Sequence, residues 1–206
     1  MKKDYPFYET TVFKDIRIMT ENVARKYPDR VAISYKNNPQ DEETVKVTYA
    51  AARDNIRSLG TGLIALGCRE QHVALIGETS YDWITSYFAL MSIGSVVVPI
   101  DKDLPTNDIA DILQAAECTF VIYSAAIENK IELLLPELNS LQKAICMAGK
   151  TKIPGPVDLS TIVADGSNRL TAGDTNYDDY VIDPDRLATI VFTSGTTGRS
   201  KGVMLS

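Results

Sequence analysis

The chain has 206 residues, of which 45% are apolar and 23% are charged. This length is enough for one substantial core, or for one and a half domains, and the composition is ordinary for a soluble globular protein. The net charge of −6 argues against nucleic acid as the main partner, because phosphate backbones attract clustered lysine and arginine.

The cysteines and the first residues bear on the cellular context. Cys68, Cys118 and Cys146 are odd in number and have no CxxC spacing, so the sequence indicates neither a disulfide framework nor a zinc site. Residues 1–13 carry two lysines but no apolar region after them, which is unlike a signal peptide, and no apolar stretch reaches the roughly 20 residues of a membrane helix. We therefore expect a reduced cytoplasmic protein with no transmembrane segment, in which Cys118 and Cys146 are buried thiols.

The first 70 residues predict a helix, a β-hairpin and a second helix. Apolar residues recur at helical spacing over residues 16–27, and Pro28 ends that helix. Two β-rich runs, residues 31–36 and 44–49, flank a polar turn-forming tract and predict the hairpin. The second helix is predicted over residues 49–66, with Gly67 as its stop.

From residue 72 onward, strand and helix patterns alternate. The predicted strands are residues 72–77, 95–100, 119–123, 143–148 and 187–192. The predicted helices are residues 80–93, 107–116 and 125–141, the last of them kinked or split at Pro136. Thr79 with Asp82 suggests a capping box for the first of these helices, and Thr106 a cap for the second. This alternation predicts a doubly wound, mostly parallel α/β sheet flanked by helices, with ligands at the carboxyl ends of its strands.

The region before the last strand is less regular. A short helix is predicted over residues 157–163, and residues 168–185 resemble an acidic loop. Among isolated residues, His72 is expected in a surface or packing role, and Lys102 and Asp103 in a solvated loop. Helical spacing places four further side chains in the core rather than in a ligand site: Trp83, Tyr87, Leu90 and Met91.

The most informative segment is TSGTTGRSKG, residues 193–202, which directly follows the last predicted strand. Its glycines allow backbone amides to approach a ligand closely, its hydroxyls add donors, and its lysine adds a compact positive charge. These groups favour a polyphosphate ligand. The spacing differs from that of a Walker P-loop, and the alternative is a flexible solvent-facing connector.

This segment resembles the phosphate-binding signature of the adenylate-forming enzymes, which include acyl-CoA synthetases, firefly luciferase and the adenylation domains of peptide synthetases. The family pattern is roughly Thr-Ser-Gly-Thr-Thr-Gly-x-Pro-Lys-Gly-Val, and this chain has Ser200 where proline is commoner. Residues 28–32, 72–83 and 94–101 also resemble segments of the family. The resemblance implies an incomplete N-terminal AMP-binding domain over residues 1–206, divided into a lead-in (1–70) and an α/β nucleotide subdomain (71–206).

The resemblance also implies a chemistry. A carboxylic acid, most like a medium or long fatty acid, would react with ATP to give an acyl-adenylate and pyrophosphate, and coenzyme A (CoA) would then take the acyl group. Mg²⁺ would accompany ATP, with Thr193 as one ligand. The expected phosphate-binding residues are Thr193, Ser194, Gly195, Thr196, Thr197, Gly198, Lys201 and Gly202.

The family's adenine pocket, magnesium-binding glutamate and catalytic lysine lie downstream of this loop. We therefore expect no catalytic residue within these 206 residues, a chain that is an N-terminal piece of a longer ligase, and no turnover by the chain alone. Two alternatives remain open. One is an adenylation domain of a peptide synthetase or an aryl-acid ligase, and the other is a non-enzymatic nucleotide-binding module. The oligomeric state is not predicted.

Overall fold

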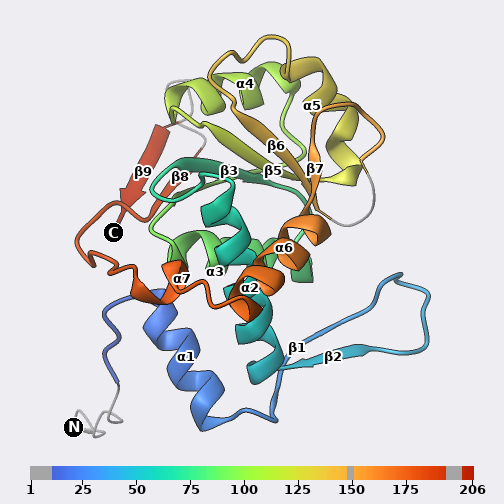
Figure 1. Ribbon diagram of the computed structural model, residues 1–206. Helices are drawn as coiled ribbons and strands as arrows, with labels where there is room; N and C mark the ends of the chain where they lie inside the picture. Colours follow the sequence, from blue (N-terminus) through green and yellow to red (C-terminus); the bar gives the residue numbers. More distant parts are fainter. Residues whose placement is uncertain (1–10, 148–150, 194–200) are drawn as a thin grey trace, which may run out of the picture.

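A computed structural model describes residues 11–147, 151–193 and 201–206 (Figure 1). Its centre is a sheet with the strand order β7-β6-β5-β3-β4-β8-β9, in which every neighbouring pair is parallel except β8 and β9. The strands are β3 (His72–Ile76), β4 (Val96–Ile100), β5 (Phe120–Ser124), β6 (Lys143–Met147), β7 (Val157–Asp158), β8 (Thr189–Thr193) and β9 (Lys201–Leu205).

Helices cover both faces of this sheet. In Figure 1, α4 (Thr106–Ala115) and α5 (Glu128–Leu134) lie above it, and α2 (Tyr49–Ala65), α3 (Tyr81–Ser92) and α6 (Leu159–Thr171) lie below. Each layer has its own core, and successive residues of β3 alternate between the two: Ala74 and Ile76 pack with α4 and α5, Val73 and Leu75 with α2, α3 and α6. Burial on both faces explains the almost uninterrupted apolar runs of the strands. The predicted doubly wound α/β fold is confirmed.

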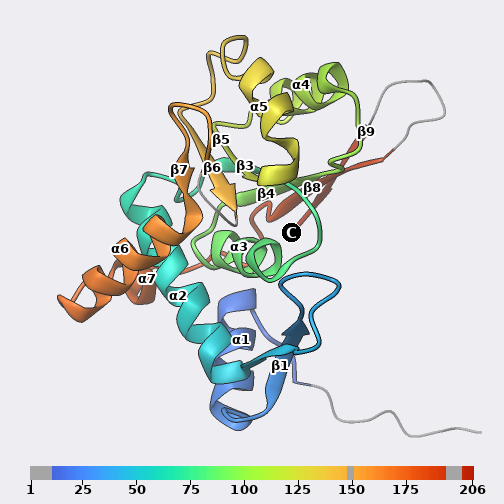
Figure 2. The same ribbon diagram turned by 90° about the vertical axis from the view of Figure 1, so that its right-hand side faces the viewer.

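The lead-in also follows the prediction. Helix α1 (Ile16–Lys26) begins at Asp15, whose carboxylate accepts a hydrogen bond of 2.8 Å from the amide of Ile18. Strands β1 (Val31–Tyr35) and β2 (Val45–Thr48) form the antiparallel hairpin, and the Thr48 hydroxyl caps α2. Figure 2 shows α1 and this hairpin on the side of the molecule that carries α3.

Three details of the predicted helices are wrong. Ser80, not Thr79, caps α3, and its hydroxyl accepts from the amide of Trp83 at 3.1 Å. Thr106 is the first residue of α4 and makes no capping bond; Pro105 precedes it. The helix predicted over 125–141 is a 3₁₀ turn (Ala125–Ile127) followed by α5, which ends before Pro136 because proline has no N–H to continue the ladder.

The segment before β8 is more helical than its composition indicated. Instead of a short helix over 157–163, residues 157 and 158 form β7, and α6 continues to Thr171. Within the predicted acidic loop, Asn176–Asp179 form the short helix α7. The glycine inside α6 lowers its helix propensity, but this glycine packs directly on α2, and that tertiary contact outweighs the local preference.

Candidate functional site

The hairpin of β8 and β9 brings the ends of the predicted phosphate loop together. Strand β8 runs parallel to β4, so Thr193 lies at the carboxyl edge of the sheet, where doubly wound folds bind ligands. The start of β8 is fixed by two hydrogen bonds to β4: the amide of Val97 donates to the carbonyl of Ala188 at 2.9 Å, and the Thr189 hydroxyl donates to the carbonyl of Val97 at 2.7 Å. A strand bonded into the core therefore carries one end of the loop.

Of the eight predicted phosphate-binding residues, the structure describes three. Thr193 and Lys201 are exposed partners across the hairpin, and Gly202 lies opposite Phe192 in β9. A Cβ atom on Gly202 would lie 2.9 Å from the Cγ2 of Ile190, so a larger residue there would displace the Ile190 side chain. Lys201 and Gly202 were predicted as loop residues and are strand residues. The other five lie outside the described residues: Ser194, Gly195, Thr196, Thr197 and Gly198.

A second loop at the same edge follows β4 and contains an ion pair. Lys102 and Asp103 lie in a loop, as predicted, and form an ion pair of 2.7 Å that was not predicted. This pair raises the pKa of Lys102 and lowers the pKa of Asp103. Lys130 of α5 donates to the carbonyls of Lys102 and Leu104, both at 2.8 Å. Lys102 is thereby engaged by its own loop, next to the strand that carries Thr193.

A buried carboxylate that the sequence analysis missed lies at the start of α5. The Oε1 atom of Glu128 accepts from the hydroxyl of Thr151 at 2.7 Å, from the amide of Lys152 at 3.0 Å and from the hydroxyl of Tyr123 at 3.3 Å. These hydrogen bonds, that from Thr151 first, lower the pKa of Glu128. They tie the segment after β6 to α5. A single glutamate in a helical pattern gives no sequence signal for such a role.

Within residues 11–147, 151–193 and 201–206, the cysteines, the histidine and the acidic residues are candidates for metal binding and reactivity. The described residues contain no group of three His, Cys, Asp or Glu side chains that could hold a metal ion. Burial raises the pKa of Cys68 and Cys118 to about 12, so both thiols stay protonated near neutral pH. The Nδ1 atom of His72 lies 2.6 Å from the carbonyl oxygen of Ala116, which agrees with the predicted packing role. In the described part of the chain, no helix is both long and apolar enough to cross a bilayer.

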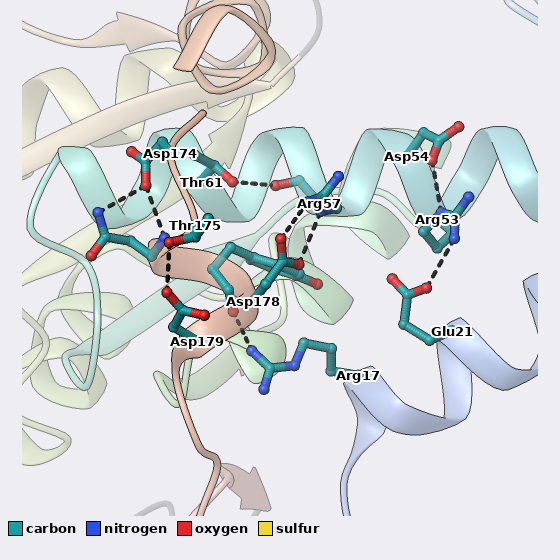
Figure 3. Close-up of polar contacts among 12 residues, drawn as sticks. Arg17, Glu21, Arg53, Asp54, Arg57, Thr61, Asp174, Thr175, Asp178 and Asp179 are labelled. Carbon is teal, nitrogen blue, oxygen red and sulfur yellow. Dashed lines mark hydrogen bonds and ion pairs between the residues drawn. The ribbon is translucent and has the colours of Figure 1, made fainter. Parts of the chain in front are cut away.

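Residues 172–188, which we call the crossing segment, lead from the end of α6 to β8. Figure 3 shows two arginines reaching it from different helices. Arg57 of α2 binds the carboxylate of Asp178 through two nitrogens, one of them at 3.0 Å, and Arg17 of α1 donates to two backbone carbonyls of the segment. Tyr177 is buried against α2. The approach to β8 is thus bound to both lead-in helices.

Comparison with known proteins identifies the family. Residues 20–206 match the family model described as AMP-binding enzyme. The chain belongs to this family. It is 23% identical over 203 residues to the human mitochondrial medium-chain acyl-CoA ligase ACSF2, covering 90% of this chain and 32% of that protein. It is 28% identical over 189 residues to the phosphinothricin tripeptide synthetase PhsC of Streptomyces viridochromogenes, covering 90% of this chain and 15% of that protein.

Solved structures agree with the fold. The crystal structure of the long-chain-fatty-acid-CoA ligase FadD1 from Archaeoglobus fulgidus aligns with a TM-score of 0.80 at 21% identity, covering all of this chain and 39% of that one. At this identity the likeness shows the fold alone. The chain spans about a third of the length of the curated acyl-CoA ligases that it matches.

Proposed function

We propose that this chain is the N-terminal part of an ATP-dependent acid–thiol ligase. In the first half-reaction, a carboxylate oxygen bonds to the α-phosphorus of ATP while the bond to the bridging oxygen breaks and pyrophosphate leaves. In the second, the thiol of CoA loses its proton to solvent and its sulfur bonds to the acyl carbon, while the bond from that carbon to the phosphate oxygen breaks and AMP leaves. One observation carries the proposal: a member of the AMP-binding family has its ten-residue Gly-Thr-Ser-Lys signature joining two paired strands at the carboxyl edge of the sheet.

The proposed role of the signature is to bind the β- and γ-phosphates. Pyrophosphate leaves with a high negative charge, and preorganised amides, hydroxyls and a lysine stabilise that charge as it develops. We assign the hydroxyl contacts to Thr193, Ser194, Thr196 and Thr197, the charge to Lys201, and close backbone approach to the loop glycines Gly195 and Gly198. We also assign Gly202 a backbone contact; its packing against Ile190 is a second reason for a small residue at this position.

The described residues would provide one ligand to Mg²⁺. Mg²⁺ in nucleotide sites takes most of its ligands from phosphate oxygens and water, with one or two from the protein. The hydroxyl of Thr193, an exposed residue, would supply one such ligand, and the described residues offer no acidic cluster that would bind the ion without phosphate. When bound, Mg²⁺ would neutralise charge on the phosphates.

For the acid, we propose a medium- or long-chain fatty acid. The names of two similar proteins, a medium-chain acyl-CoA ligase and a long-chain-fatty-acid-CoA ligase, support this class. The alternative is an adenylation domain that passes its acid to a carrier protein, and the similarity to a tripeptide synthetase supports it. A carrier domain encoded downstream of residue 206 would favour the alternative. A reading frame without one would favour CoA.

Three further expectations belong to this proposal. Residues 1–70 form a lead-in and residues 71–206 the nucleotide subdomain. The protein is cytoplasmic, which the unpaired, buried cysteines Cys68, Cys118 and Cys146 support. The 206-residue chain does not form acyl-CoA by itself, and turnover with ATP, a fatty acid and CoA would contradict this.

The experiment is calorimetric titration of the chain with pyrophosphate. We expect a dissociation constant near 1 mM for the chain, and binding about tenfold weaker for Lys201→Gln, since a phosphate contact loses its charge. Lys102→Gln is the matched control, because that lysine lies at the same sheet edge but is paired with Asp103. Equal effects of the two substitutions, or no binding to the unaltered chain, would contradict the proposal.

A further inference from the structure

The hydroxyl of Tyr180 is the centre of a polar cluster just before β8. It donates to the carboxylate of Glu70 at 2.8 Å and accepts from the guanidinium of Arg186 at 2.9 Å. Arg186 also reaches Glu70 at 3.3 Å, which closes a triangle of three side chains. We call Glu70, Tyr180 and Arg186 the Tyr180 triad. Its members come from the loop before β3 and from the crossing segment.

Two backbone positions at the triad have left-handed conformations. Glu70 has a φ of 60°, a left-handed conformation that is uncommon for a residue with a side chain. Gly94, between α3 and β4, has a φ of 74°, and a Cβ atom there would lie 2.3 Å from the Tyr180 hydroxyl oxygen. A second contact holds the ring, because the guanidinium of Arg69 lies 5.0 Å from its centroid. The Tyr180 hydroxyl thus contacts Glu70, which has an unfavourable backbone conformation, and lies where position 94 has room only for glycine.

The triad lies directly upstream of the hairpin. Arg186 is followed by Leu187, which packs against the core, and by Ala188, whose amide donates to the carbonyl of Leu205 at 2.8 Å. The register between β8 and its parallel neighbour β4 is given by a single pair, Val97 with Thr189. Two hydrogen bonds to β4 hold the start of β8, and because this parallel pairing is short, contacts of the chain before β8 can add to its position.

We propose that Tyr180 is a positioning residue: by holding Arg186 against Glu70, its hydroxyl adds to the bonds between β4 and β8 in fixing the start of β8 and limits local opening of the β8–β9 hairpin. In this way it holds Thr193 and Lys201 in place. The ligand part of this inference rests on the proposed function, and the structural part does not. Neither the family match nor the signature motif indicates a role for Tyr180.

Hydrogen exchange of the 206-residue chain, followed by mass spectrometry, tests the structural part. Tyr180→Phe removes one hydroxyl and keeps the ring, and we expect exchange in residues 189–193 and 201–205 to become roughly fivefold faster, the effect of one lost hydrogen bond on local opening. Peptides from β5 and α2 should be unchanged. Tyr35→Phe, in the β1–β2 hairpin, is the control and should leave β8 and β9 unaffected.

A second variant tests whether the effect comes from the triad and not from the tyrosine side chain alone. Glu70→Gln keeps the shape of the side chain but removes the charge that Arg186 pairs with, and it should loosen the same peptides. Faster exchange in all peptides alike would mean that the triad only adds global stability, and unchanged exchange in β8 and β9 would mean that it positions nothing. Either result overturns the inference.

Hydrogen exchange with pyrophosphate at millimolar concentration tests the ligand part of the inference. It should slow exchange in residues 201–205 of the unaltered chain, and Tyr180→Phe should need about fivefold more pyrophosphate for the same protection. If pyrophosphate protects neither protein, the proposed function fails while the exchange without ligand still decides the structural part. If it protects both at the same concentration, Tyr180 does not position the ligand site.

Discussion

At the scale of residues, the carboxylate of Glu128 connects sequence-distant parts of the fold. It is buried, and it accepts hydrogen bonds from Tyr123, Thr151 and Lys152. All three favour its charged form, which is why its pKa is lowered. The segment that follows β6 is therefore held by a group whose charge depends on pH.

Glu128→Gln should lower stability at pH 7 by about 1 kcal/mol, since it replaces charge-assisted hydrogen bonds with weaker ones. A group with a lowered folded pKa stabilises the protein above its unfolded pKa, about 4.3 for glutamate, and this contribution is lost as pH falls through the folded pKa. The difference between the two proteins in urea unfolding should therefore be largest above about pH 5 and shrink below pH 4.

Glu132→Gln is the control for this prediction, because Glu132 is exposed on the same helix. It should change the free energy of unfolding little at either pH. A difference for Glu128→Gln that stays constant from pH 7 to pH 3 would show that its charge does not contribute.

The sequence marks residues 193–202 as a motif but gives no sign of the polar clusters around Glu128 and Tyr180. Thr193, Lys201 and Gly202 were found because their types and spacing form one continuous motif. Glu128 and Tyr180 were missed because each has a partner that is far away in the sequence: Thr151 lies 23 residues from Glu128, and Glu70 lies 110 residues from Tyr180. Contacts of that kind depend on the tertiary fold, so no local pattern reveals them.

At the scale of elements, α2 and α6 cross at two glycines. A Cβ atom on Gly166 would lie 1.8 Å from the carbonyl oxygen of Ser58, and one on Gly62 would lie 2.2 Å from that of Ile162. Both obstacles are backbone atoms and cannot turn aside. The close approach of these two helices therefore requires both glycines.

Gly166→Ala should destabilise the protein by roughly 2 kcal/mol, because α6 must move away from α2. Alanine in a helix is normally better than glycine by about 1 kcal/mol, so a net loss would show the cost of the clash. Thermal or urea unfolding measures the effect. Ser167→Ala, at the next and exposed position of α6, should be nearly neutral; a stabilised Gly166→Ala protein would show that the crossing is loose.

Element boundaries were predicted best where local signals and packing agree. Strands β3 to β6 were located because apolar β-branched residues fill both faces of the sheet. Helix α6 was underestimated because its stability comes from the contact with α2, and β9 was missed because pairing across residues 194–200 has no sequence pattern of its own. The order of the strands did not follow from the sequence either.

At the scale of the whole molecule, the two cores and the crossing segment together determine where β8 lies. The cores fix β4, the crossing segment returns the chain across the lower face, and β8 then joins β4 at the edge where parallel sheets bind ligands (Figures 1 and 2). The antiparallel strand β9 brings Lys201 back beside Thr193. The fold thus presents both ends of the signature at the carboxyl edge, as expected of an AMP-binding enzyme.

The central claim, that residues 193–202 bind the anionic end of a nucleotide, is tested most directly by amide chemical shifts. The isotope-labelled chain would be titrated with pyrophosphate, with sulfate as a less charged comparison. We predict that the largest shifts fall within residues 193–202 and saturate near millimolar pyrophosphate, and that sulfate has a weaker effect at the same positions. Largest shifts elsewhere in the chain, or none in this segment at about 10 mM pyrophosphate, would contradict the claim.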